Sequence, residues 1–93
     1  MDKLPNEEKT MLTILYFASL REVLGKADES MTANPFKTVD CLIKSLAERG
    51  EMWTGALLNN TNLQIAVNHD VADRNTKLKA GDEIAFFPPV TGG

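Results

Sequence analysis

Side chains that build metal sites and catalytic triads are nearly absent from this sequence. Cys41 is its one cysteine and His69 its one histidine. A single cysteine excludes an internal disulfide, and one cysteine with one histidine cannot supply the four nitrogen or sulfur ligands of a structural zinc site. No glycine-rich phosphate-binding loop occurs either. The sequence thus has no catalytic constellation of its own, and we expect no stably bound cofactor or metal.

Long apolar runs and an excess of basic residues are also missing. The apolar stretches are short, as in residues 14–18, whereas a membrane-spanning helix needs about 20 residues. Ten lysines and arginines stand against 13 acidic residues, a net charge of −3, and nucleic-acid binders instead concentrate positive charge. The first ten residues lack the apolar segment of a secretory signal. We therefore expect a soluble, cytoplasmic protein with no membrane or nucleic-acid partner.

What the sequence does contain is the composition of one ordinary globular domain. The chain has 93 residues, of which 43% are hydrophobic and 25% charged, as in a chain with a single core and unlike a disordered one. Residues 1–10 are polar and lack periodicity, so we expect a disordered extension, with Met11 as a second possible start. The folded domain is predicted over residues 11–87 and an extended tail over residues 88–93.

The segment after Met11 predicts a strand, a short helix and a second strand. Residues 12–17 carry apolar groups on both faces of a β-strand pattern, so that one face would meet the core and the other a partner. Ser19 and Glu22 have the spacing of a capping box, and Gly25 would end the helix that they begin. The second strand is expected over residues 29–33.

The middle of the chain predicts the principal helix. Thr38 is a candidate N-cap, and apolar residues recur at helical spacing before Gly50. These apolar residues are Val39, Leu42, Ile43, Leu46 and Ala47. A second helical piece, containing Trp53 and Leu57, would end at the turn over residues 59–62.

The last third predicts strands only. Leu63, Ile65 and Val67 alternate, a short edge strand is possible near Val71, and a turn over residues 79–82 leads into a last strand over residues 83–87. This order of elements favours an α+β domain, a mixed sheet packed on one principal helix.

Cys41 and His69 are reactive residue types, but the sequence explains both without a catalytic role. Cys41 falls opposite the apolar stripe of the principal helix, and no helix N-terminus or histidine is evidently placed to lower the pKa of its thiol, so an incidental surface cysteine is favoured. His69 beside Asp70 is typical of a polar turn rather than of a catalytic pair.

The end of the chain carries the clearest functional pattern. Pro88 and Pro89 stop the last strand, because proline has no amide hydrogen for the ladder. Residues 88–93 could extend about 20 Å, at about 3.3 to 3.6 Å per residue. Gly92 and Gly93 have no Cβ and could enter a narrow channel. Such an end presents the carboxylate of Gly93, which is unreactive until a partner adenylates it, and this favours a carrier.

Over residues 11–93 the chain resembles the small subunit of molybdopterin synthase, a family of ubiquitin-like β-grasp sulfur carriers. The resemblance rests on the final run Gly-Asp-Glu-Ile-Ala-Phe-Phe-Pro-Pro-Val-Thr-Gly-Gly and on Leu15-Tyr16-Phe17-Ala18 followed by Arg21-Glu22. It implies that an adenylating, E1-like activating enzyme consumes ATP at Gly93 and that a persulfide sulfur donor makes the thiocarboxylate. The molybdopterin synthase large subunit, in a heterotetramer, would then transfer the sulfur to cyclic pyranopterin monophosphate in molybdenum cofactor biosynthesis.

The resemblance also implies a partner-binding surface beside the tail. Alternation leaves Phe17 and Phe87 on the open face of the sheet, with Val71 nearby, while the side chains one step away face the main helix. The inward set is Ile14, Tyr16, Ile84 and Phe86. Arg21 would add a polar contact or be a solvated helix charge. The tail residues that would enter the partner are Pro88, Pro89, Val90, Thr91 and Gly92, with Gly93 as the reacting end.

Three other functions stay open. A thiamine-pathway sulfur carrier shares the fold and the Gly-Gly end but resembles this chain less in the Phe-Phe-Pro-Pro-Val run. A ubiquitin-like modifier would join Gly93 to lysines of target proteins. A plain interaction module would not need Gly92 and Gly93 at all.

Overall fold

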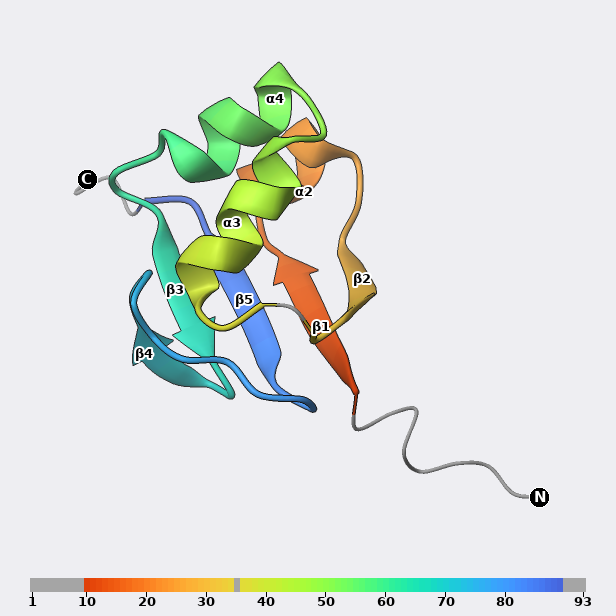
Figure 1. Ribbon diagram of the computed structural model, residues 1–93. Coiled ribbons are helices and arrows are strands. Elements are labelled where there is room, and N and C mark those ends of the chain that lie inside the picture. The colour runs from red at the N-terminus through yellow and green to blue at the C-terminus, as the bar shows by residue number, and fades with distance from the viewer. Residues whose placement is uncertain (1–9, 35, 90–93) are drawn as a thin grey trace.

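The computed structural model describes residues 10–34 and 36–89 and confirms the α+β class, with a mixed sheet packed against helices (Figure 1). The strand order is β2-β1-β5-β3-β4. In chain order the elements are β1 (Met11–Tyr16), α2 (Ser19–Leu24), β2 (Asp28–Thr32), α3 (Val39–Ala47), α4 (Glu51–Trp53), η1 (Thr54–Leu58), β3 (Gln64–Val67), β4 (Asp70–Ala72) and β5 (Glu83–Phe87). The first and last strands of the chain thus lie side by side in the middle of the sheet.

The register of the two central strands decides which side chains form the core. β1 and β5 are parallel, with Ile14 opposite Ile84 and Tyr16 opposite Phe86. Side chains alternate along a strand, so these four share one face. All four are at most 1% exposed and belong to the core cluster under the helices. The inward set predicted from alternation is confirmed, and α3 crosses this face (Figure 1).

The principal helix is α3, as predicted. The side chain of Thr38 caps it by accepting from the backbone N–H of Cys41 at 3.3 Å. One face of the helix is buried, and it consists of Val39, Leu42, Ile43, Leu46 and Ala47. A helix with an apolar stripe of this kind gains its stability mainly from packing on the sheet.

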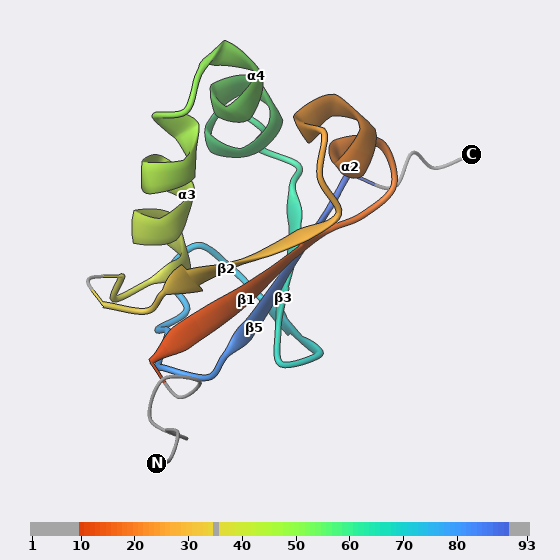
Figure 2. The same cartoon turned by 90° about the vertical axis from the view of Figure 1, so that its right-hand side faces the viewer.

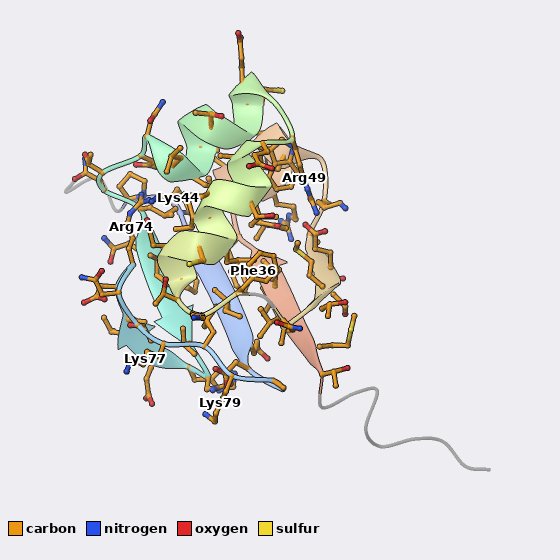
Figure 3. The ribbon with its side chains drawn as sticks, viewed as in Figure 1. Phe36, Lys44, Arg49, Arg74, Lys77 and Lys79 are labelled. Carbon is orange, nitrogen blue, oxygen red and sulfur yellow. The ribbon has the colours of Figure 1, made fainter. Side chains whose placement is uncertain are left out.

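The second helical piece has a form that periodicity did not predict. α4 runs directly into η1, a π-helix in which the N–H of Asn59 donates to the carbonyl of Thr54 at 2.8 Å. The hydroxyl of Thr54 donates back to the carbonyls of Ala47 and Gly50 at 2.9 and 3.1 Å. At the C-terminal end of η1, the guanidinium of Arg74 donates to the carbonyls of Leu57 and Asn60 (Figure 3). Side-chain bonds therefore stabilise a backbone form that is rare on its own.

The capping box predicted at Ser19 and Glu22 is wrong. Ser19 is already the first residue of α2, Ala18 occupies the N-cap, and no side-chain cap hydrogen bond forms there. The amides of Arg21 and Glu22 donate instead to the carbonyl of Ala18 at 3.0 and 3.4 Å. A capping box needs the serine one position earlier, outside the helix. The predicted end of the helix is confirmed, because Gly25 is left-handed at φ 77.

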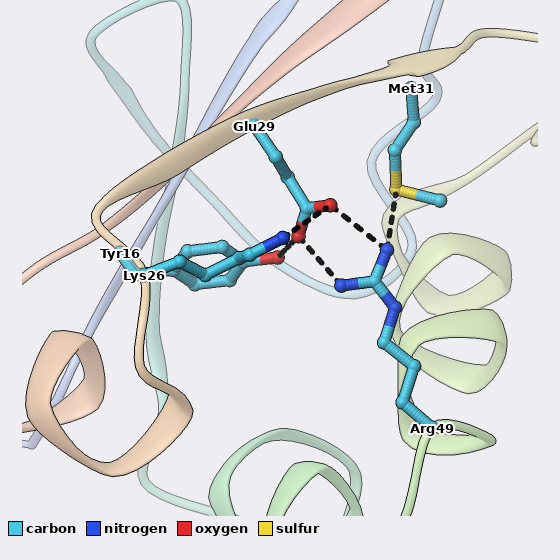
Figure 4. A network of polar contacts seen from close by, with 5 residues as sticks. All are labelled: Tyr16, Lys26, Glu29, Met31 and Arg49. Carbon is cyan, nitrogen blue, oxygen red and sulfur yellow. Dashed lines mark hydrogen bonds and ion pairs between the residues drawn. The ribbon is translucent and has the colours of Figure 1, made fainter.

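An ion-pair network ties the edge strand β2 to the helices (Figure 4). Arg49 donates to both carboxylate oxygens of Glu29 at 2.8 and 2.9 Å, and the hydroxyl of Tyr16 donates to Glu29 at 2.6 Å. Burial alone would raise the pKa of Glu29, but the hydrogen bonds from Arg49 and Tyr16 outweigh it and hold the pKa below its usual range. Arg49 also lies 4.6 Å over the ring of Trp53.

Candidate functional site

The face of the sheet opposite α3 carries the aromatic residues that sequence reasoning assigned to a partner. Phe17 follows β1 and Phe87 ends β5. Their rings stack, with centroids 4.6 Å apart and planes 5° from parallel. Phe17 is 37% exposed although it is a large apolar side chain. The geometry places both rings on the open face, as expected, and their role in binding stays a prediction.

Backbone pairing holds this aromatic pair in place. The N–H of Phe17 donates to the carbonyl of Phe86 at 3.1 Å, which continues the β1–β5 pairing one residue past the strand. On its other side Phe87 is opposite Gln64 of β3. Phe87 is therefore fixed between two neighbouring strands at the point where the chain leaves the sheet.

A shallow groove of about 360 Å³ lies beside Phe87 on this face. Its lining comes from β3, the following turn, β4 and the end of β5, and consists of Gln64, Ile65, Ala66, His69, Val71 and Phe87. Val71 is 94% exposed, which is unusual for an aliphatic side chain on a strand. An apolar groove beside an aromatic pair is the kind of surface that a protein partner covers.

The rim of the groove is polar. His69 and Asn68 form the two-residue loop between β3 and β4, both with positive φ, at 74 and 53. This confirms the turn predicted there. Nε2 of His69 lies 3.2 Å from Oε2 of Glu83, so its contact is across the sheet and not with Asp70. Asn68 also donates to Asp82, which is 3% exposed and which anchors the turn over residues 79–82 by accepting from the N–H of Lys79.

Arg21 is exposed on α2, and none of the other described residues forms an ion pair or hydrogen bond with its guanidinium. Within the part of the chain that the structure describes, its charge is thus unpaired. Pro88 and Pro89 follow β5 and are half-buried. The remaining predicted site residues, Val90, Thr91, Gly92 and Gly93, lie outside the described residues.

Cys41 is exposed, as predicted, but the expectation that no helix N-terminus lies near its thiol is wrong. The residue lies in the first turn of α3, where the hydroxyl of Thr38 donates to Sγ at 3.4 Å and lowers that pKa. In the part of the chain that the structure describes, no three His, Cys, Asp or Glu side chains gather to hold a metal ion. Over the same residues no helix has the length and apolar character needed to cross a membrane.

Comparison with known proteins places the chain in a family. Residues 14–93 match the ThiS family. The chain belongs to this family. The molybdopterin synthase sulfur carrier subunit of Haemophilus influenzae is 41% identical over 83 residues, which cover 89% of this chain and all of that protein. The fold is accordingly the ubiquitin-like β-grasp predicted from the resemblance.

Two further relatives of this ThiS-family chain bear on partners. A solved complex of subunits 1 and 2 of the molybdopterin-converting factor from Helicobacter pylori contains a chain with 28% identity and a TM-score of 0.63, covering 89% of this chain and 99% of that one. Small archaeal modifier protein 3 of Haloferax volcanii is 29% identical over 88% of this chain and 98% of its own length. The first relative assembles with a second subunit, and the second bears the name of a modifier.

Four residues of the groove were missed by sequence reasoning, namely Gln64, Ile65, Ala66 and His69. Alternation along β3, in which Ile65 and Val67 are buried, could have placed Ala66 on the open face. The sequence pattern does not predict that β3 pairs with β5. This pairing brings Gln64 next to Phe87.

Proposed function

We propose that this chain is the sulfur carrier subunit of a cytoplasmic molybdopterin synthase. One observation carries the proposal: 41% identity to a protein of that name along that protein's whole length. The final run Phe-Phe-Pro-Pro-Val-Thr-Gly-Gly of the sequence supports it, because Gly92 and Gly93 have no Cβ and can enter a narrow channel.

The chemistry is carried by the α-carboxylate of Gly93. An E1-like activating enzyme joins it to AMP from ATP and releases pyrophosphate. The terminal sulfur of a persulfide donor then displaces AMP and forms an acyl disulfide with the donor. A second thiol reduces the S–S bond of this acyl disulfide, is itself oxidised to a disulfide with the donor sulfur, and so releases the thiocarboxylate. In the large subunit this sulfur passes to cyclic pyranopterin monophosphate, and the carboxylate is regenerated for another cycle.

In this scheme the described residues bind the partner and set the direction in which the chain leaves the sheet. The stacked pair Phe17 and Phe87, with the groove at Val71, offers an apolar face for the large subunit. Arg21 supplies a charged group at its edge. Pro88 and Pro89 prevent the chain from continuing as a strand, so that the tail leaves the sheet beside this face.

Extension of the chain tests the role of Gly93. Adding one residue after Gly93 should abolish sulfur loading, because adenylation needs the free carboxylate of glycine. Wild type, incubated with ATP, activating enzyme and sulfur donor, should gain the mass difference between sulfur and oxygen on its C-terminal peptide. It should lose that mass when the large subunit and the pterin precursor are added.

Cys41→Ser is the matched control, since it removes the only thiol without touching the terminus. It should load and deliver sulfur like wild type. Added mass on Cys41, or sulfur delivery by the extended chain, would contradict the proposed carrier chemistry.

Protein modification is the second candidate, and the 29% identity to a small archaeal modifier protein favours it over a plain interaction module. Its product would be Gly93 in isopeptide linkage to a lysine of another protein. A thiamine-pathway carrier would instead deliver sulfur to a thiazole precursor and leave molybdopterin formation unaffected. Mass spectrometry of cell extracts detects the isopeptide linkage of a modifier. Molybdopterin assays in a deletion strain separate the molybdopterin synthase carrier from the thiamine-pathway carrier.

A further inference from the structure

The groove beside Phe87 ends at a polar pair. Its lining runs along β3 from Gln64, which is opposite Phe87, to His69 in the loop after the strand. There Nε2 of His69 lies 3.2 Å from Oε2 of Glu83, the first residue of β5. Phe87 ends the same strand, so the two ends of the groove are about 13 Å apart at about 3.3 Å per residue. Figure 2 shows the loop after β3 and the end of β5 at opposite ends of the sheet.

The loop itself does not need a histidine. Asn68 and His69 have φ 53 and 74, and two-residue loops of this kind favour asparagine and glycine. Asn68 meets that preference, and its side chain also donates to Asp82 and accepts from the backbone N–H of Glu83. Among the residues that the structure describes, the imidazole of His69 has one polar contact, the side chain of Glu83. The ring therefore serves the groove rather than the turn.

The contact with Glu83 determines which atoms this pair can offer to a partner. A carboxylate oxygen only accepts, so the hydrogen of the neutral imidazole lies on Nε2, and Nδ1 has the free lone pair. In the described part of the chain no donor reaches Nδ1 of His69 or Oε1 of Glu83. Over the same residues no lysine or arginine pairs with Glu83, and Lys79 of the preceding turn pairs with Asp82. The polar end of the groove thus accepts hydrogen bonds and carries negative charge.

We infer that this polar end receives a lysine or arginine side chain of the protein that covers the groove. Such a side chain has an apolar stem and a cationic head that only donates hydrogen bonds. The stem fits the apolar lining at Val71, which is 94% exposed, and the head fits Nδ1 of His69 and the carboxylate of Glu83. The inference rests on the proposed function for the identity of the partner, the molybdopterin synthase large subunit, and adds the group by which that partner binds here.

Two ends of different chemistry fix the direction in which a partner lies on the open face. An apolar group belongs at Phe87 and a cation at Glu83. A partner turned end for end would place apolar atoms on the carboxylate of Glu83, which is costly to desolvate without a counter-charge. Charges at the rim of an interface contribute more to register and association rate than to affinity. His69 and Glu83 are therefore specificity-determining residues, and their effect on affinity is modest.

Two variants test the pair by calorimetric titration against the large subunit. Glu83→Gln removes the charge and keeps a carbonyl oxygen that can accept from His69. His69→Asn removes the ring and keeps a residue that tolerates positive φ. At low salt, about 0.1 M, each should bind about two- to fivefold more weakly than wild type, the worth of an exposed ion pair. At high salt, about 1 M, the screening length is about 3 Å, and the deficit of Glu83→Gln should disappear.

Glu48→Gln is the matched control. It removes one negative charge from an exposed glutamate at the C-cap of α3, on the helix-covered side of the sheet. It should bind like wild type at low and at high salt. All three variants should unfold close to the wild-type urea concentration, because none of these side chains belongs to the core cluster.

Wild-type affinity of either groove variant at low salt would overturn the inference. So would a Glu83→Gln deficit that persists at high salt, which indicates a role in shape, or an equal loss in Glu48→Gln, which indicates net charge. A His69→Asn chain that unfolds at a clearly lower urea concentration would assign the ring to the fold instead of the interface. If wild type itself does not bind the large subunit, the proposed function fails and this inference with it. Binding by wild type with no deficit in the variants overturns the inference alone.

Discussion

At the scale of single residues, one step along a strand separates the core from the candidate site. Tyr16 and Phe86 are 1% and 0% exposed, whereas Phe17 is 37% exposed. Alternation explains this contrast, because successive side chains of a strand point to opposite faces. The aromatic residues next to one another in the sequence therefore serve different purposes.

Phe87→Asp should weaken binding to the large subunit while the domain stays folded. A carboxylate without a counter-charge is costly to desolvate in an apolar interface. Calorimetric titration against the large subunit measures the loss, and Met52→Asp on the exposed side of α4 is the control that should bind normally. Equal affinity of Phe87→Asp and wild type would remove Phe87 from the interface.

Alternation also marks the limit of prediction for single residues. It assigned Phe17, Phe87 and Val71 to the open face correctly, because a strand alternates whatever its neighbours are. It could not assign Gln64 or His69 to the groove, since their position depends on which strands pair. That choice is made by long-range packing.

At the scale of elements, the sequence pattern predicted α3 and the strands to within one or two residues, with the weakest signals at β2 and β4. The apolar stripe of α3 and its cap at Thr38 are local properties, so the sequence pattern contains them. The start of α2 and the π-form of η1 are not local. The first follows the hydrogen bond from the N–H of Phe17 to the carbonyl of Phe86 in β5, and the second depends on bonds from Arg74, a residue far along the chain.

The network that joins Glu29 of β2 to Tyr16 of β1 and to Arg49, which follows α3, predicts a pH dependence of stability. The pKa of Glu29 is lower in the folded protein than its usual value, so its contribution is present above the unfolded-state pKa of about 4.3 and is lost as pH falls through the folded-state pKa. The difference in melting temperature between wild type and Glu29→Gln should therefore be largest near neutral pH and shrink in acid.

Asp28→Asn provides the matched control, because Asp28 is an exposed carboxylate on the same strand. Its melting temperature should follow that of wild type more closely across the same range. A Glu29→Gln difference that is constant from neutral pH to about pH 3, well below the usual glutamate pKa, would show that the network contributes no charge-dependent stability.

At the scale of the whole molecule, the sheet separates the hydrophobic core from the proposed partner face. Its helix-covered face holds the core cluster, including Leu46 of α3, and its open face holds Phe17, Phe87 and the groove. Under the proposed function, the chain keeps the same fold while it meets an activating enzyme and then a synthase. A sheet with one face reserved for partners allows this, because the core need not change between encounters.

This division predicts that changes on the two faces act independently. Leu46→Ala should lower the free energy of unfolding by about 2 to 5 kcal/mol, because a fully buried leucine leaves a cavity. Phe87→Asp should cost at most the stacking with Phe17, about 0.5 to 1.5 kcal/mol. In the double variant the two losses should add to within about 0.3 to 0.5 kcal/mol in urea titrations, as for residues without shared partners. The Leu46→Ala chain, titrated at a temperature where it is folded, should bind the large subunit as tightly as wild type. Strong coupling between the two substitutions, or weak binding by Leu46→Ala alone, would mean that the core and the partner face are one cooperative unit rather than two.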